Sequence, residues 1–116
     1  MLLYLSACTN RESKLLHGKW QVKKININGT AFDSSFTANW SYVFLPSGTY
    51  TAQLFATDTG NYLLKENAIN FYSTIKTKPH NTVFKITRLD SQLLVLQSTD
   101  SNNIQLHLQK YSTTHE

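Results

Sequence analysis

Short runs rich in Val, Ile, Tyr, Phe and Thr recur along the chain after His17, and turn residues separate one run from the next. This pattern is typical of an all-β sandwich or barrel, and no window of the sequence shows a convincing helical period. The alternation is clearest between Ile104 and Leu108, where apolar and polar residues exchange at every position. We therefore predict eight strands, at residues 19–27, 40–45, 49–56, 61–65, 69–73, 82–89, 92–98 and 104–111.

The first expected strand changes its hydrophobic parity halfway along. Trp20 and Val22 occupy one face, whereas Ile25 and Ile27 continue in the opposite parity. A bulge near residues 23–24 would keep all four apolar side chains directed inward.

The expected connections are short at one end of the strands and longer at the other. Eight consecutive strands joined in this way favour an eight-stranded antiparallel up-and-down β-barrel with one end closed by tight turns. Closure also removes the exposed edges that an open sheet would leave. The turns of the closed end are expected at 46–48, 66–68 and 90–91, the open-end loops at 28–39, 74–81 and 99–103, and a further turn at 57–60.

Large side chains dominate the face that parity directs into the barrel. An eight-stranded barrel is just wide enough to be filled by side chains or to hold one small ligand. Both interpretations stay open, and an empty interior of roughly 300 Å³ or more would favour the ligand. The residues expected at the interior and mouth are Trp40, Tyr42, Tyr50, Leu54, Tyr62, Phe71 and Phe84.

Charge and candidate chemistry argue against an enzyme and against nucleic-acid binding. The net charge is +4, and the basic residues are scattered rather than gathered in a stripe. The seven acidic residues fall in the tails or in expected loops and turns, so no carboxylate is expected to point into the barrel. The four histidines are far apart, and no phosphate loop or nucleophile elbow occurs. We expect no catalytic site, metal or cofactor.

The N-terminal segment "MLLYLSAC" is apolar and ends at Cys8, the only cysteine. It is too short to span a bilayer, and Cys8 has no disulfide partner within the chain. Residues 5–8 resemble the lipobox of bacterial lipoproteins, in which the signal is cut before a cysteine that then carries lipid. The alternative is a buried N-terminal segment with an ordinary thiol. The resemblance implies a signal remnant at 1–8, a polar tether at 9–14, a barrel at 15–111 and a tail at 112–116.

Four further stretches resemble one family. Gly18-Lys19-Trp20 looks like the Gly-x-Trp motif of lipocalins and related calycin barrels, and "YVFLPSGTY", "GNYLL" and "LHLQKY" are similar to the lipocalin-like domains of small envelope lipoproteins in Bacteroidetes-type bacteria. The chain is shorter than true lipocalins. In that family an arginine near the end of the last strand packs on the tryptophan, and the matching position here is Lys110.

The resemblance implies a motif that closes the barrel, formed by Gly18, Trp20 and Lys110. Arg88 is added to this motif because it shares the inward parity of Phe84 and lies near the closed end of its strand. It is expected to cap the barrel near Trp20, and the alternative is that it receives an anion. A lipid on Cys8 implies attachment to the outer membrane, facing the periplasm. Residues 9–17 would reach about 30 Å if extended, which directs the closed end towards the membrane.

Two functions of different classes follow. The first is an envelope lipoprotein that binds a small apolar or amphiphilic ligand at the open end. The second is an interaction protein with a filled barrel, whose open-end loops bind another envelope protein. Lipoprotein inhibitors of lysozyme are a precedent for the second, although their Ser-Gly-x-x-Tyr loop is matched here only by residues 47–50, one residue short.

Overall fold

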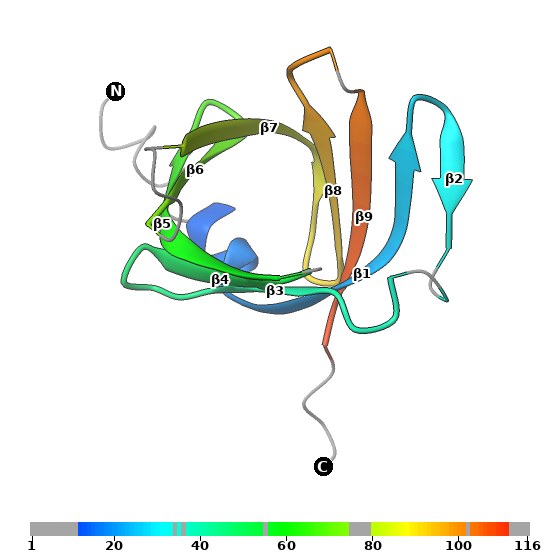
Figure 1. Ribbon diagram of the computed structural model, residues 1–116. Helices are drawn as coiled ribbons and strands as arrows, with labels where there is room; N and C mark the ends of the chain where they lie inside the picture. The colour runs from blue at the N-terminus through cyan, green and yellow to red at the C-terminus, as the bar shows by residue number, and fades with distance from the viewer. Residues whose placement is uncertain are drawn as a thin grey trace.

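Nine antiparallel strands form one continuous sheet in the computed structural model, which describes residues 12–33, 35, 37–54, 56–74, 80–101 and 103–111 (Figure 1). The strands are β1 (Gly18–Ile27), β2 (Thr30–Phe32), β3 (Ser41–Phe44), β4 (Thr49–Gln53), β5 (Thr57–Lys65), β6 (Ala68–Ser73), β7 (His80–Leu89), β8 (Leu93–Ser98) and β9 (Ile104–Lys110).

Eight of these strands close into a barrel. The order is β2-β1-β3-β4-β5-β6-β7-β8-β9, and a further pairing of β1 with β9 joins the two ends. Strand β2 lies outside the ring as a short extension beside β1. The expected eight-stranded up-and-down barrel is therefore confirmed, and every strand of the ring has two neighbours.

Strand β1 pairs with three other strands because it is bent. Its first half pairs with β3, its second half pairs with β2, and β9 runs along its other edge. The register with β9 shifts between Val22 and Lys24, which is the bulge that the change of parity predicted. Val22 and Ile25 are both buried. The expectation for Ile27 was wrong, because this side chain is 37% exposed at the far end of β1.

Two loop expectations were also wrong. Strand β2 forms within the segment 28–39, where a loop was expected. Residues 57–60 belong to β5 rather than to a turn, and the chain reverses before them, where Leu54 N–H donates to the Ala56 carbonyl. The sequence Thr-Asp-Thr-Gly has turn composition, yet in the barrel these residues pair with Gln53, Ala52, Thr51 and Tyr50 of β4.

The closed end of the barrel carries the turns after β3, β5 and β7, and the open end carries the remaining connections. The turn from β5 to β6 is a two-residue hairpin in which Glu66 and Asn67 both have positive φ, at 51° and 63°. These angles match the type I′ turn, whose twist suits antiparallel strands.

A helical turn at residues 12–16 covers the closed end, within the barrel outline of Figure 1. Leu16 is fully buried, and its carbonyl accepts a hydrogen bond of 2.8 Å from the indole N–H of Trp20. Residues 12–14 were expected to belong to a polar tether, but the structure places them in this turn. Among the described residues, no helix is long and apolar enough to cross a membrane.

The expected role of Arg88 as a cap near Trp20 is wrong. A bulge between Ile86 and Arg88 shifts the parity of β7, so Arg88 turns outward. Its side chain is 59% exposed and pairs with Asp90, with 3.2 Å between Nε and Oδ2. Leu89 then faces the core beside Ile86.

Candidate functional site

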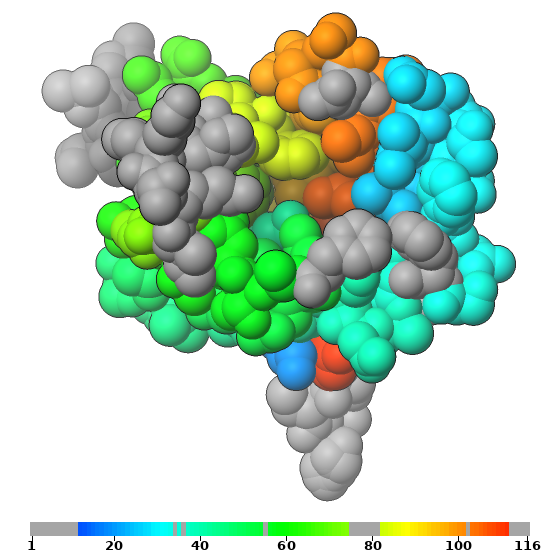
Figure 2. Space-filling view, viewed as in Figure 1, coloured from blue at the N-terminus to red at the C-terminus, as the bar shows by residue number. Residues whose placement is uncertain are grey.

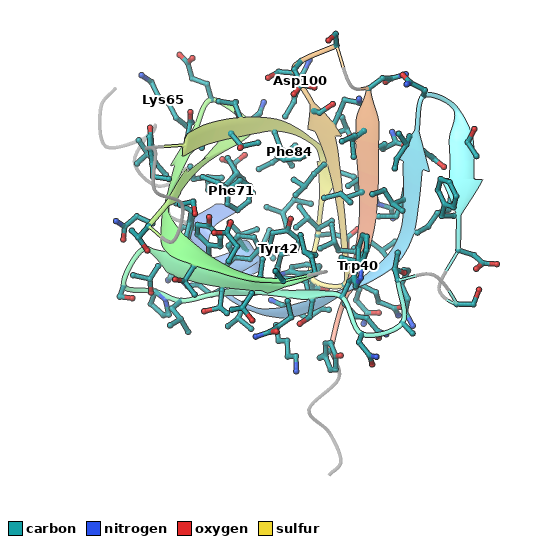
Figure 3. The ribbon with its side chains drawn as sticks, viewed as in Figure 1. Trp40, Tyr42, Lys65, Phe71, Phe84 and Asp100 are labelled. Carbon is teal, nitrogen blue, oxygen red and sulfur yellow. The ribbon has the colours of Figure 1, made fainter. Side chains whose placement is uncertain are left out.

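A cavity of about 80 Å³ lies inside the barrel towards its open end. Figure 2 shows a recess near the centre of the barrel outline, and Figure 3 shows Tyr42, Phe71 and Phe84 projecting into the barrel, whereas Lys65 projects away from it. The lining residues come from β3, β4, β5, β6 and β7 and are Tyr42, Tyr50, Asp58, Phe71, Ser73, Thr82 and Phe84.

Asp58 is the one carboxylate of this lining, and it corrects the expectation that no carboxylate points into the barrel. The Tyr50 hydroxyl donates to its Oδ2 at 2.9 Å, and the Ser73 hydroxyl donates to its Oδ1 at 2.5 Å. Neighbouring strands supply these partners, because β5 lies between β4 and β6. Among the Lys, Arg and His side chains that the structure describes, which exclude that of His80, none forms an ion pair with Asp58.

Tyr42 brings a second polar group to the cavity. Its side chain is only 7% exposed, and its hydroxyl makes no hydrogen bond to any described residue. Burial and the charge of Asp58 raise the pKa of Tyr42, so the phenol stays protonated. Burial, together with the hydrogen bond to Asp58, likewise raises the pKa of Tyr50. The lining of the cavity therefore carries two neutral phenols and one carboxylate.

Aromatic rings form the apolar walls. The ring of Phe71 lies 4.9 Å from that of Tyr50 at 77° and 6.0 Å from that of Phe84 at 83°, both edge-to-face arrangements. Tyr42 lies 5.9 Å from Phe71 at 50°. Edge-to-face pairs stabilise one another beyond simple burial, so these walls have a defined shape.

Four of the seven expected interior residues meet in this cavity, and three do not. Trp40 and Leu54 pack against the core at the ends of β3 and β4 but are not in the cavity lining. Tyr62 lies towards the closed end, where its hydroxyl donates to the Leu45 carbonyl at 2.9 Å. Cys8 lies outside the described residues.

The polar lining residues Asp58, Ser73 and Thr82 were missed, and the parity of their strands carried the signal. Asp58 shares its parity with Tyr62, Ser73 with Phe71, and Thr82 with Phe84. Assigning 57–60 to a turn made the expected strand begin at residue 61, three residues after Asp58. Extending its alternation by three residues towards the N-terminus would have placed this carboxylate inside the barrel.

The size and chemistry of the cavity limit what it holds. Its volume lies well below the roughly 300 Å³ at which ligand pockets begin, so it accommodates a small group rather than a whole lipid. Among the described residues, no cluster of three or more His, Cys, Asp or Glu side chains could hold a metal ion. The cavity combines apolar walls with a carboxylate and a buried, unpartnered hydroxyl.

At the closed end, Gly18, Trp20 and Lys110 lie together. The Lys110 ammonium lies 4.8 Å from the centroid of the Trp20 ring. Gly18 has a φ of +126°, and a Cβ there would lie 3.1 Å from Lys110 Cε. Burial lowers the pKa of Lys110. This cluster joins β1 to β9 and contributes nothing to the cavity lining.

Comparison with known proteins supports the same architecture. No family model and no curated protein sequence matches the chain. A lipocalin-like protein from Bacteroides uniformis superposes with a TM-score of 0.66 and 22% identity over 84% of this chain and 99% of that one. An uncharacterised protein from Bacteroides eggerthii superposes with a TM-score of 0.64 and 17% identity, over 83% of this chain and 99% of that one. A DUF4847 family protein from Bacteroides vulgatus superposes with a TM-score of 0.62 and 14% identity, over 90% of this chain and 99% of that one. The chain therefore has a lipocalin-like β-barrel fold.

Proposed function

We propose that this chain is a binding protein whose open barrel end takes an amphiphilic small molecule by its polar head. The observation that carries the proposal is the Tyr42 hydroxyl, which is buried in the cavity wall and has no partner among the described residues. Buried polar groups are nearly always hydrogen-bonded, and an exception calls for an explanation such as a bound group.

The volume of the cavity decides how such a ligand lies. About 80 Å³ encloses a head group only, so the body of the ligand remains at the mouth. Half-buried side chains of Trp40, Leu54 and Ile104 pack against the core near the open end and offer apolar surface there. The ligand is therefore partly enclosed, unlike a fatty acid held deep within a large barrel.

The proposal includes no catalytic step. Asp58 is the single carboxylate among the described lining residues, and none of these residues is a histidine. A second acid or base within reach would be needed for paired acid–base work. The two phenols hold their protons because their pKa values are raised, so they act as hydrogen-bond partners.

Envelope attachment is part of the proposal and rests on Cys8 and the lipobox-like residues 5–8. In a chain that carries a complete upstream signal, Cys8→Ser is expected to abolish incorporation of labelled fatty acid and to release the protein from membranes. Two or more acyl chains give stable anchoring at about 0.8 kcal/mol per buried CH₂. Membrane retention that is unchanged in Cys8→Ser would contradict the lipid anchor.

The interaction protein remains the second candidate, because the small cavity volume favours it. On that interpretation a side chain of a partner envelope protein enters the cavity while the open-end loops contact the partner's surface. Both candidates use the same cavity, and they differ in the size of what binds.

Native mass spectrometry of the purified full chain tests the proposal. We expect an adduct of small-molecule mass that is absent from Thr82→Phe, a variant that fills the cavity opposite Phe71 in the β6–β7 pairing. Thr87→Phe, on the outward face of the same strand, is the matched control and should keep the adduct. A protein-sized adduct lost in Thr82→Phe would favour the interaction protein, and an adduct retained in Thr82→Phe would place binding elsewhere.

A further inference from the structure

We propose that the group bound in the cavity is a protonated amine, held by Asp58 and Tyr42. This inference rests on the proposed function and adds the chemical class of the ligand. It follows from the charge of the cavity, its unused acceptors and its walls.

The charge of the cavity favours a cation. Asp58 is half-buried and lines the cavity, and no described basic side chain pairs with it. A partly buried charge is screened by salt much less than an exposed one. Among the side chains that the structure describes, no cation would compensate the charge between this carboxylate and an anionic head group, whereas an ammonium would itself neutralise the carboxylate.

The hydrogen-bonding capacity matches an ammonium with N–H donors. Each oxygen of Asp58 accepts one hydrogen bond from a described residue, Oδ2 from Tyr50 and Oδ1 from Ser73, while a carboxylate offers about four lone-pair sites. The Tyr42 oxygen is a further acceptor, buried and without a partner among the described residues. An alkylammonium brings three donors, and Asp58 and Tyr42 offer acceptors for them.

The walls suit a cation as well. The rings of Tyr42, Tyr50, Phe71 and Phe84 surround the same space, and a ring face attracts a cation within about 6 Å of its centroid. The volume of about 80 Å³ matches a compact head group rather than a long chain. The amine is thus expected to enter head first and to leave its body at the mouth.

Nuclear magnetic resonance titration of the full chain tests this inference with three probes of one size: butylammonium, 1-butanol and butyrate. We expect butylammonium to shift the amides of Ser73, Thr82 and Phe84 saturably and to bind at least about tenfold more tightly than 1-butanol, as one charge-assisted hydrogen bond implies. Butyrate should give no cavity shifts.

Three variants assign the effect. Asp58→Asn keeps the shape of the side chain and should weaken butylammonium binding by about tenfold or more. Tyr42→Phe removes only the unpartnered hydroxyl and should weaken it by a smaller factor while leaving the barrel folded. Asp33→Asn, at an exposed carboxylate of the open-end loop, is the matched control and should bind as the unmodified chain does.

The outcomes separate the two proposals. Equal binding of butylammonium and 1-butanol in the cavity would overturn the preference for an amine and leave the binding function standing. Equal loss in Asp33→Asn and Asp58→Asn would overturn it too, because general attraction to the open end would then be the cause. Both proposals would be overturned if no probe shifted the cavity amides at concentrations up to about 100 mM. This concentration lies far above the dissociation constant expected of a small ligand in a fitting site.

Discussion

The ammonium of Lys110 lies over the ring of Trp20, 4.8 Å from its centroid, at the closed end of the barrel. The same nitrogen donates to the carbonyls of Leu15 and His17, at 2.9 Å and 2.6 Å. One side chain of β9 thereby holds β1 and the chain that leads into it from the helical turn. The contact is a packing and hydrogen-bonding device that fixes the closed end while the open end remains available.

Removing the Lys110 charge should loosen this end. Lys110→Met keeps most of the stem but loses two hydrogen bonds and the cation–π contact, and we expect a loss of about 2 kcal/mol in the free energy of unfolding. Lys110→Arg should lose less, because guanidinium keeps both the donors and the stacking. Urea denaturation measures the effect, with the exposed Lys85→Met as the matched control. Equal stability of Lys110→Met and Lys85→Met would show that the contact contributes nothing.

Trp20 should be among the most sensitive core positions. It is fully buried, and its indole N–H bonds to Leu16. Trp20→Ala is expected to lose about 3–5 kcal/mol, as other large buried aromatics do. Trp20→Phe keeps a ring but leaves the Leu16 carbonyl unpaired, and a loss of about 1–3 kcal/mol should follow. Trp40→Ala, at a half-buried position, provides the comparison, and a loss below about 1 kcal/mol for Trp20→Ala would contradict a closing role.

Gly60 should tolerate no side chain. A Cβ at this position would lie 2.0 Å from the Tyr72 carbonyl oxygen and 2.9 Å from Ser73 Cα, so β5 and β6 would have to separate. We expect Gly60→Ala to lose about 1–3 kcal/mol or more, as overpacked cores do, and to disturb the Ser73–Asp58 hydrogen bond. Gly48→Ala is the control, because open space surrounds Gly48 and only its φ of +94° opposes a side chain. Thermal denaturation of both variants measures the two losses of stability, and the loss should be larger for Gly60→Ala.

The repeating features of the fold were predictable, because period-two alternation and turn chemistry act locally. The bulge of β1 followed from the parity change after Val22, and the β5–β6 hairpin followed from the tight turn expected at 66–68. The closed barrel followed from the number of strands. These features depend on side chains that lie close together in the sequence, so a single chain displays them.

The cavity was predicted only in part, because its polar residues depend on strand boundaries. Tyr42, Tyr50, Phe71 and Phe84 were found as aromatic positions of one parity, but Asp58 was lost to a turn that the structure places elsewhere. The prediction that Arg88 points inward failed for the opposite reason, because a bulge in β7 reversed a parity that is continuous in the sequence. Pairing with a neighbouring strand sets both the start of β5 and the bulge of β7, although the alternation of β5, extended back to Asp58, would have indicated the first.

Alkaline pH should destabilise the barrel through its buried phenols. The pKa values of Tyr42 and Tyr50 are raised, so the folded chain keeps protons that the unfolded chain begins to lose near pH 10. The free energy of unfolding should be unaffected by these groups below about pH 10 and fall as pH rises above it, by up to about 1.4 kcal/mol per pH unit for each group. Tyr42→Phe should remove one such contribution.

Urea denaturation at several pH values above about 9 measures that slope, with Tyr72→Phe, at a ring 40% exposed, as the matched control. The absorbance of phenolate gives a second readout. Complete ionisation of all six tyrosines while the barrel remains folded would contradict the environment described for Tyr42 and Tyr50.

The proposed lipid anchor, together with the helical turn, predicts how the barrel faces the membrane. A lipid on Cys8 would be separated from the turn at 12–16 by three residues, which span about 10 Å at full extension. This is shorter than the 30 Å reach of an extended 9–17 segment, because the turn packs on the closed end. The closed end should therefore face the membrane, and the cavity should open away from it.

Labelling of single cysteines on the lipidated protein in vesicles tests this orientation. Ser35→Cys and Ser101→Cys, at the open end, should react with a bulky thiol reagent faster than Ser47→Cys and Ser91→Cys, at the closed end. All four positions are exposed on the barrel itself. The control is the same four variants combined with Cys8→Ser and free in solution, in which the labelling rates at the two ends should not differ. A reversed order in vesicles would overturn the orientation, because the mouth of the cavity would then face the lipid. Equal rates in vesicles and in solution would show that residues 9–11 impose no orientation, and a ligand or partner would then reach the cavity from any side.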